Sequence, residues 1–288
     1  MKILITGAGG QLSQDLVMTS APRAQIFALS KTDLDITRID QIQSAINKLQ
    51  PDCVINTAAC TGVDQAELEQ DHAFAINRDG PRLLAEALAG TNIRLIHYST
   101  DYVFDGKKHA PYTTTDTPNP INIYGASKLE GEKAVINALG KRALIIRTAW
   151  LYSNHGVNFV TRMLQLMKTR DTLRVVSDQT GSPTWTRSLA SATWQLIKIP
   201  ALHGIHHYCD TGQTNWFEFA GAIMETALQH DLLTKRVEIL PISSADYNAH
   251  AKRPAYSVLD CTQTWRLLEH EPDAWKLSLG KLLEEMNK

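Results

Sequence analysis

The chain of 288 residues is 43% hydrophobic and 20% charged, a composition typical of a globular protein with one large domain or two smaller ones. Its formal net charge of −1 excludes a protein that attracts nucleic acid or an anionic membrane through its overall field. No apolar stretch approaches the roughly 18 residues that a membrane-spanning helix needs, and the apolar run after Met1 and Lys2 is too short for a signal-peptide core.

In chain order, short aliphatic runs alternate with helical patterns through the first half. We expect strands at 2–6, 25–29, 53–57, 93–99 and 143–147, and helices at 11–19, 39–49, 71–89 and 127–139. This alternation predicts an α/β fold of the Rossmann type, a doubly wound parallel sheet with helices on both faces. Right-handed crossovers bring the C-terminal ends of the strands to one edge, where ligands bind. The segments expected at this edge are 7–10, 58–61, 100–101 and 148–150.

A glycine turn that contains Gly7 and Gly10 follows the first expected strand and precedes the first helix. This order is typical of dinucleotide-binding sites, because glycines let the backbone approach a pyrophosphate that faces the helix N-terminus. Ser13 stands where a third glycine is usual and is small enough to be tolerated. Taken alone, the pattern also fits a plain glycine turn.

Ser30 and Lys31 follow the second expected strand, where NAD sites usually carry an acidic residue for the ribose 2′-hydroxyl. A hydroxyl and a cation suit a 2′-phosphate, which favours NADPH as the cofactor. Asp33 or Asp35 could still reach the adenosine, so NADH stays open.

Tyr124 and Lys128 stand four residues apart, about one helical turn, so their side chains fall on one face. A nearby ammonium favours the phenolate and lowers the pKa of a tyrosine, and a lysine can also reach a cofactor ribose. Thr100 could bond the same carbonyl oxygen. A Tyr-x-x-x-Lys spacing alone is also common in solvated pairs. Together with the glycine turn, the pattern predicts a nicotinamide-dependent reductase whose proton donor is a tyrosine.

The pattern changes after about residue 150, where polar and aromatic loops appear at 152–158, 178–184 and 249–256. We predict an NAD(P)-binding domain over 1–150 and a smaller, mainly substrate-binding lobe over 151–288. The strand expected near 204–209 should rejoin the main sheet. Neighbouring strand residues point to opposite faces, so His206 and His207 do not indicate a metal site. The four cysteines lack C-x-x-C spacing, and we expect reduced, mostly buried thiols in a cytoplasmic protein.

The chain resembles the extended short-chain dehydrogenase/reductases in several segments. They are 7–13, 56–59, 63–67, the Ser-Thr-Asp-Tyr-Val-Phe-Asp-Gly block at 99–106, and 124–128. Within this family the chain is similar to the dTDP-4-dehydrorhamnose reductases, and matches at 147–152, 178–184 and 253–254 extend the resemblance to nearly the whole chain. The resemblance implies NADPH-dependent reduction of dTDP-4-dehydro-6-deoxy-L-mannose at C4. The implied product is dTDP-L-rhamnose, used in the synthesis of cell-surface polysaccharides.

By this resemblance Tyr124 donates the proton, Lys128 lowers its pKa and binds the nicotinamide ribose, and Thr100 lies beside the carbonyl. Substrate contacts are expected at Thr100, Asp101, Tyr124, Trp150 and Arg253, with Arg253 at the diphosphate because a guanidinium suits bidentate phosphate bonding. The expected cofactor contacts are Gly7, Gly10, Gln11, Leu12, Ser30, Lys31, Asp35, Ile36, Ala59, Cys60, Thr61, Tyr124 and Lys128.

Structural roles stay open as alternatives for several of these residues. Trp150 could belong to the core, Asp101 could cap a turn, and Arg253 could form a surface ion pair. Asp64 and Glu67 are expected to be structural, capping the helix that follows them.

The chain departs from the family pattern in a loop expected at the sugar pocket. Cys60 and Gly62 stand where family members often carry histidine and alanine, so another sugar stays open. Some family members are magnesium-bridged dimers. Asp15 matches one acidic ligand but the others have no match, so magnesium stays possible without being predicted, and a homodimer stays open.

Two other functions remain as alternatives. One is a reductase of another dTDP-4-keto-deoxysugar, and the other is a non-catalytic, dinucleotide-binding regulatory subunit. A dehydratase is not expected, because Asp101 is followed by Tyr102 rather than by the second acidic residue that elimination of water needs.

Overall fold

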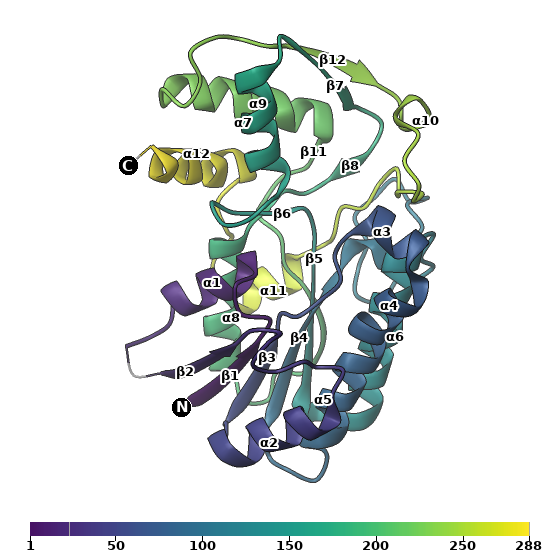
Figure 1. Ribbon diagram of the computed structural model, residues 1–288, viewed down its shortest axis with the longest axis vertical. Coiled ribbons are helices and arrows are strands. Elements are labelled where there is room, and N and C mark those ends of the chain that lie inside the picture. Colours follow the sequence, from purple (N-terminus) through teal and green to yellow (C-terminus); the bar gives the residue numbers. More distant parts are fainter. Residues whose placement is uncertain (23, 288) are drawn as a thin grey trace.

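The computed structural model describes residues 1–22 and 24–287 and is built around a six-stranded parallel sheet (Figure 1). The strand order is β10-β5-β4-β3-β1-β2. The strands are β1 (Lys2–Thr6), β2 (Gln25–Leu29), β3 (Cys53–Asn56), β4 (Arg94–Thr100), β5 (Ala143–Thr148) and β10 (Gly204–His207). The predicted fold class is therefore confirmed, and the strand bounds agree with the sequence pattern to within one residue for the first five.

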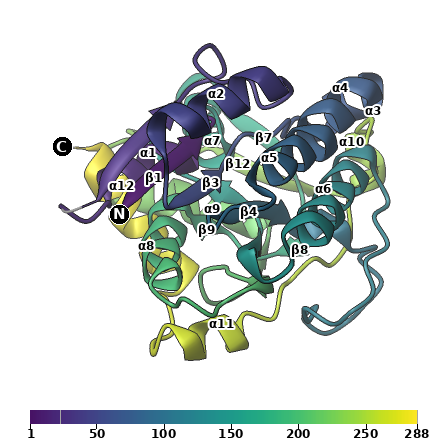
Figure 2. The same cartoon turned by 90° about the horizontal axis from the view of Figure 1, so that it is seen from below.

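Alternate residues along the strands enter two separate cores, because neighbouring side chains point to opposite faces of a sheet. Ile3 and Ile5 pack with α1 (Gln11–Met18) and α8 (Thr186–Ile197). Leu4 packs on the other face, beneath three further helices. They are α2 (Ile39–Leu49), α5 (Gly80–Leu88) and α6 (Ile123–Leu139). Figure 2 shows α5 and α6 together on one side of the sheet and α8 on the other.

The helix predicted over 71–89 is present, but a π-helical turn interrupts it. Its parts are α4 (Gln70–Phe74), the π-helical turn η1 (Ala75–Asp79) and α5, and a separate short helix, α3 (Val63–Leu68), precedes them. The wide turn places the buried amide of Asn77 where it donates to the carbonyl oxygen of Cys60 at 2.9 Å and to the Ser127 hydroxyl at 3.0 Å. Single π-turns of this kind interrupt helices for a specific contact, and apolar periodicity does not reveal them.

Helix α6 begins at Ile123, four residues before the predicted start at 127. The side-chain oxygen of Asn122 accepts a hydrogen bond from the backbone N–H of Gly125 at 2.7 Å, which satisfies one of the free donors at the helix start. The helix therefore includes Tyr124 in its first turn. Short helices flank this region at η2 (Asp101–Val103) and η3 (Gly140–Arg142).

The C-terminal half forms a lobe above the C-terminal edge of the sheet in Figure 1, with its own core around Tyr152 and Phe219. Two segments of the C-terminal half belong to the sheet domain instead. Strand β10 pairs with β5, as the sequence pattern predicts, and α8 covers one face of the sheet. The remaining strands are β6 (Leu151–Tyr152), β7 (Thr172–Val176), β8 (Thr180–Gly181), β9 (Thr184–Trp185), β11 (Thr214–Asn215) and β12 (Glu238–Ile242). The helices are α7 (Phe159–Thr169), α9 (Trp216–Gln229), α10 (Ser244–Tyr247), α11 (Thr262–Leu267) and α12 (Trp275–Met286). Across the described part of the chain, none of the helices has the length and apolar character to cross a membrane.

Candidate active site

A cavity of about 780 Å³ lies at the C-terminal edge of the sheet, between the sheet and the C-terminal lobe. The glycine turn after β1, the end of β4, the start of α6 and the segment after β5 all contribute to its walls. Most of the residues predicted for the site line this one cavity: Gly7, Gly10, Gln11, Leu12, Lys31, Asp35, Ile36, Ala59, Thr61, Thr100, Asp101, Tyr124, Lys128, Trp150 and Arg253.

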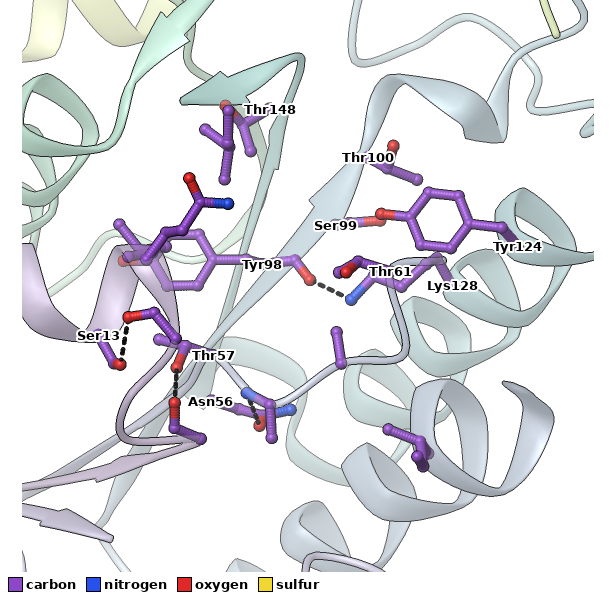
Figure 3. Close-up of a pocket in the computed structure, with 18 of the residues that line it drawn as sticks. Ser13, Asn56, Thr57, Thr61, Tyr98, Ser99, Thr100, Tyr124, Lys128 and Thr148 are labelled. Carbon is purple, nitrogen blue, oxygen red and sulfur yellow. Dashed lines mark hydrogen bonds between the residues drawn. The ribbon is translucent and has the colours of Figure 1, made fainter. Parts of the chain in front are cut away.

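Tyr124 and Lys128 reach the cavity from the first two turns of α6, and Figure 3 shows the phenol pointing toward Thr100 at the end of β4. Tyr124 is partly exposed to the cavity, whereas Lys128 is 3% exposed. The ammonium of Lys128 donates a hydrogen bond to the backbone carbonyl oxygen of Tyr98 at 2.6 Å. The helix thus presents both side chains on one face, as their spacing predicts.

The protonation of this pair differs from the sequence-based expectation. The enclosed position raises the pKa of Tyr124 to about 12, and a hydrogen bond with Thr100 acts in the opposite direction. Burial lowers the pKa of Lys128 to about 8, with the charge of Glu132 opposing the shift. Desolvation sets the direction of the Tyr124 pKa shift, and the ammonium of Lys128 bonds the Tyr98 carbonyl rather than the phenol. At neutral pH the phenol is protonated and the lysine is charged, which suits a proton donor beside a cation.

Thr100 and Asp101 lie at the end of β4 and are 5% and 2% exposed. The Thr100 hydroxyl donates to a carboxylate oxygen of Asp101 at 3.0 Å and accepts from the backbone N–H of Tyr102 at 3.2 Å. Burial raises the pKa of Asp101 to about 7. The cap of η2 is therefore Thr100, and Asp101 is the first residue of that turn. Asp101 also brings a titratable group to the cavity.

The glycine turn fits a dinucleotide. Gly7 has a φ of +76°, and a Cβ at this position would lie 2.7 Å from the backbone nitrogen of Ala58, so any larger residue would push the turn away from the end of β3. Gly10 precedes α1, whose free N–H groups face the cavity edge where a pyrophosphate would bind. Ser13 is accommodated because its hydroxyl turns inward and donates to the carbonyl oxygen of Gly10 at 2.8 Å.

Two predicted cofactor residues do not line the cavity. The Ser30 hydroxyl donates to the carboxylate of Asp33 at 2.6 Å, and Cys60 is held through its backbone N–H and carbonyl by the side chain of Asn77, each at 2.9 Å. Lys31, by contrast, lines the cavity. Asp35 also lies there, and hydrogen bonding from the Thr37 backbone N–H at 2.9 Å lowers its pKa.

Arg253 also lines the cavity and pairs with Asp64, with 2.7 Å between a guanidinium nitrogen and a carboxylate oxygen. Asp64 also accepts from the backbone N–H of Ala251 at 2.9 Å, so it holds the loop that carries the arginine rather than capping the following helix. Glu67 accepts from the backbone N–H of Ile123 at 2.8 Å, at the start of α6. Both acidic residues have structural contacts, in agreement with the sequence analysis.

Sequence reasoning missed several residues that line the cavity. Trp216 from the start of α9, together with Gly156, Val157 and Asn158 from the loop after β6, forms part of its wall. The side-chain amide of Asn158 donates to the Gln11 side-chain oxygen at 2.9 Å, which joins this loop to the glycine turn. No local pattern in the sequence marks these residues, because their place depends on contacts between distant segments.

The acidic residue that could match a bridging-metal ligand, Asp15, is fully buried and already has partners. The Thr186 hydroxyl donates to its carboxylate, and the Nε of Arg187 lies 3.5 Å from it. Arg187 also pairs with Glu285. No three His, Cys, Asp or Glu side chains gather to hold a metal within residues 1–22 and 24–287. Within this chain the Arg187 guanidinium therefore neutralises both carboxylates.

Comparisons with known proteins agree with this geometry along the whole chain. The family model described as RmlD substrate binding domain matches residues 1–288. A protein of Aggregatibacter actinomycetemcomitans named dTDP-4-dehydrorhamnose reductase is 40% identical, with 98% of each chain covered. A protein of Streptomyces niveus named dTDP-4-keto-6-deoxy-D-glucose reductase is 36% identical over 91% of this chain and 89% of that one. The solved structure of dTDP-4-dehydrorhamnose reductase from Bacillus anthracis in complex with NADP superposes with a TM-score of 0.93, at 39% identity and 99% coverage of both chains.

Proposed function

The chain belongs to the RmlD substrate binding domain family, and we propose that it reduces dTDP-4-dehydrorhamnose at C4 to dTDP-L-rhamnose with NADPH, a step in cell-surface polysaccharide synthesis. The observation that carries this proposal is the convergence of Thr100, Tyr124 and Lys128 with the glycine turn in one cavity. Relatives of the same length named for this activity support it. The substrate is then a nucleotide sugar.

When bound in the glycine-turn end of the cavity, NADPH supplies a hydride to C4 of the sugar. The residues of the chain supply the rest of the reaction. Tyr124, whose phenol is protonated at neutral pH, donates its proton to the C4 oxygen as the carbonyl becomes a hydroxyl. The Thr100 hydroxyl is placed to bond the same oxygen, and its hydrogen bond with Tyr124 favours the phenolate that is left behind. The charged ammonium of Lys128 would bind the nicotinamide ribose. The phenolate then regains a proton from solvent before the next turnover.

The substrate is expected to extend from Tyr124 toward the C-terminal lobe. We propose that Asp101 and Trp150 contact the sugar and that Arg253, held by Asp64, binds the diphosphate. Residues 1–150 would then bind the cofactor and residues 151–288 mainly the substrate, although Thr100, Asp101 and Tyr124 reach the substrate from the first part. The four cysteines are free, which supports a cytoplasmic location. Light scattering would distinguish a monomer from the homodimer that the family resemblance allows.

The test of the proposed function is to mix the purified protein with NADPH and enzymatically prepared dTDP-4-dehydrorhamnose and to follow the absorbance of the reduced nicotinamide. Loss of the signal, with dTDP-L-rhamnose identified as the product, is the expected result. An unchanged signal with this sugar, under conditions where NADPH raises the melting temperature, would overturn the substrate assignment and leave the cofactor assignment in place.

A second candidate function is reduction of another dTDP-4-keto-6-deoxysugar. It is favoured by the Streptomyces niveus relative, which matches this chain over nine-tenths of its length under a different substrate name. The same assay with dTDP-4-keto-6-deoxy-D-glucose separates the two functions, because kcat/KM should be higher for the true substrate. A regulatory subunit without turnover is disfavoured, since Thr100, Tyr124 and Lys128 are all present in the cavity.

Cofactor preference is expected to depend on Lys31, an exposed cation that lines the cavity. We predict a larger thermal shift with NADPH than with NADH, and a roughly tenfold loss of NADPH affinity in Lys31→Ala with NADH affinity little changed, since one charge-assisted contact to the 2′-phosphate is lost. Lys48→Ala, an exposed lysine of α2 outside the cavity, is the matched control. A clearly larger shift with NADH would contradict the preference.

The pH dependence should reflect the lowered pKa of Lys128. Because burial brings this pKa down to about 8, the ammonium loses its charge well below the ordinary range for lysine, whereas Tyr124 stays protonated to about 12. We expect kcat/KM for NADPH, which reports the free enzyme, to fall as the pH rises above about 8. The alkaline limb should disappear in Lys128→Arg, whose lower residual activity should be flat to pH 10. A flat wild-type profile to pH 10 would rule out this assignment.

Chelation should have no effect, because Arg187 already neutralises Asp15 and Glu285. We predict that treatment with EDTA leaves both the turnover rate and the melting temperature unchanged. Arg187→Glu would place three carboxylates together and should lower the melting temperature, with part of the loss restored by Mg²⁺. Loss of wild-type activity on chelation, with recovery on adding Mg²⁺, would show a metal role that these contacts do not provide.

A further inference from the structure

The cavity wall contains two tryptophans that lie face to face. The rings of Trp150 and Trp216 are stacked, with their centroids 3.5 Å apart and an interplanar angle of 8°. Trp150 lies two residues after the end of β5, whereas Trp216 is the first residue of α9, in the C-terminal lobe. Both line the cavity that holds Tyr124 and Thr100. The pair therefore joins the lobe to the catalytic edge of the sheet.

The position of Trp150 is set by its surroundings rather than by its own backbone preference. Its φ is +48°, in the left-handed region that bulky side chains rarely adopt and that tends to mark functional sites. Its ring packs directly against Gly181, where a Cβ would lie 2.4 Å from Cε2 of the indole. A glycine at 181 and the stacked ring of Trp216 together keep the Trp150 indole in this place.

Trp216 is itself anchored within the lobe. Its indole N–H donates to the side-chain oxygen of Gln179 at 3.1 Å, and the amide of Gln179 donates to the Ser244 hydroxyl at 2.8 Å. Phe159 of α7 packs on the same ring, with 4.6 Å between the centroids. The Trp216 ring is thus fixed by the lobe and does not depend on Trp150 for its orientation.

We propose that Trp216 is a positioning and specificity-determining residue, which fixes Trp150 as an apolar wall against the deoxysugar ring. This inference rests on the proposed function. A 6-deoxy sugar presents a methyl group where an ordinary hexose carries a hydroxyl. Burying a methyl group against indole is favourable, whereas a hydroxyl buried there without a partner is disfavoured. Trp216 acts on the sugar through the Trp150 ring and has no role toward the nucleotide or the cofactor.

The test compares dTDP with dTDP-L-rhamnose, which differ only in the presence of the sugar, and uses NADPH as the control for the cofactor. Binding of dTDP, dTDP-L-rhamnose and NADPH is measured by calorimetry for the wild type, Trp216→Ala and Trp216→Phe. We expect Trp216→Ala to weaken dTDP-L-rhamnose by roughly tenfold or more, with dTDP and NADPH within twofold of the wild type. Trp216→Phe keeps an aromatic face and should recover part of the loss. In turnover, KM for the sugar nucleotide should rise more than KM for NADPH.

A matched control separates this effect from a loss of packing. Trp265 is a partly buried tryptophan that packs against other cores and lies outside the cavity lining. Trp265→Phe should lower the melting temperature without selective loss of dTDP-L-rhamnose. Gln179→Leu removes the acceptor for the Trp216 indole N–H and should weaken dTDP-L-rhamnose in the same direction by a smaller factor.

The outcomes distinguish the role of Trp216 from the proposed function. Equal weakening of dTDP and dTDP-L-rhamnose in Trp216→Ala, or no weakening of either, would overturn the role of Trp216 while the wild-type enzyme still turned over. A wild-type protein that binds neither thymidine nucleotide would overturn the proposed function, and the role of Trp216 with it. A further outcome is a wild type that does not reduce dTDP-4-dehydrorhamnose, while Trp216→Ala selectively weakens binding of dTDP-L-rhamnose. That result would support the role of Trp216 and assign the enzyme to another dTDP-4-keto-6-deoxysugar.

Discussion

Replacing Tyr124 with phenylalanine is expected to lower kcat by roughly 10²- to 10⁴-fold, the usual contribution of a positioned general acid. The phenol is the group that faces Thr100 in the cavity (Figure 3), and its pKa of about 12 keeps it protonated at neutral pH. Phenylalanine keeps the ring and its packing, so the melting temperature and NADPH affinity should stay near those of the wild type. Single-turnover absorbance measurements with saturating NADPH report the loss directly.

Two neighbouring groups must be separated from Tyr124 as proton donors. Tyr102 lines the same cavity, with its ring 6.0 Å from that of Tyr124 in an edge arrangement. Asp101 is a carboxyl whose pKa, raised to about 7 by burial, leaves it partly protonated at neutral pH. Tyr102→Phe should keep kcat within tenfold of the wild type. If Tyr124→Phe retained most of its rate and Asp101→Asn lost it, the carboxyl would be the proton donor instead.

The sheet was predictable because its signal is local. A strand buried on both faces is an unbroken aliphatic run, and Lys2–Thr6, buried from Ile3 onward, has the predicted bounds. The edge strand Gln25–Leu29 is only partly buried and also has the predicted bounds. The early start of α6 was also within reach, since Asn122 is a preferred N-cap residue directly before Ile123. The π-turn around Asn77 could not be predicted from the sequence. It is associated with the hydrogen bonds of the Asn77 amide to Cys60 and Ser127, which lie far away in the sequence.

For the candidate site, too, features set by local sequence were predictable and features set by distant contacts were not. Segments at the ends of parallel strands must meet at one edge, so the meeting of Gly7, Thr100 and Tyr124 followed from the order of elements. The hydrogen-bond partner of each side chain could not be predicted from this order. Ser30 bonds Asp33 and Lys128 bonds the Tyr98 carbonyl, and such partners depend on differences in distance of a few ångströms. Trp216 reaches the cavity only because the C-terminal lobe folds back over the sheet.

The buried ion pair between Glu132 and Arg147 should have the largest effect on stability. Both side chains are 1% exposed, and the guanidinium forms two parallel hydrogen bonds to the carboxylate, of 2.8 and 2.7 Å. Removing one partner leaves an uncompensated charge in the interior. We expect Arg147→Met to lower the free energy of unfolding by about 3–5 kcal/mol, measured as a shift of the urea midpoint. The control is Glu86→Gln in the exposed pair with Arg82, which should change it by less than about 0.5 kcal/mol.

The same pair links stability to catalysis, because Glu132 lies one helical turn after Lys128 on α6. Its charge raises the pKa of Lys128 against the larger lowering by burial. Glu132→Gln should therefore shift the alkaline limb of kcat/KM to lower pH, in addition to destabilising the fold. The double variant Glu132→Leu/Arg147→Met removes both charges and should recover most of the stability. It should not recover the position of the limb, since the carboxylate that supports the ammonium is still missing. Recovery of both would show that the pair acts on Lys128 only through the fold.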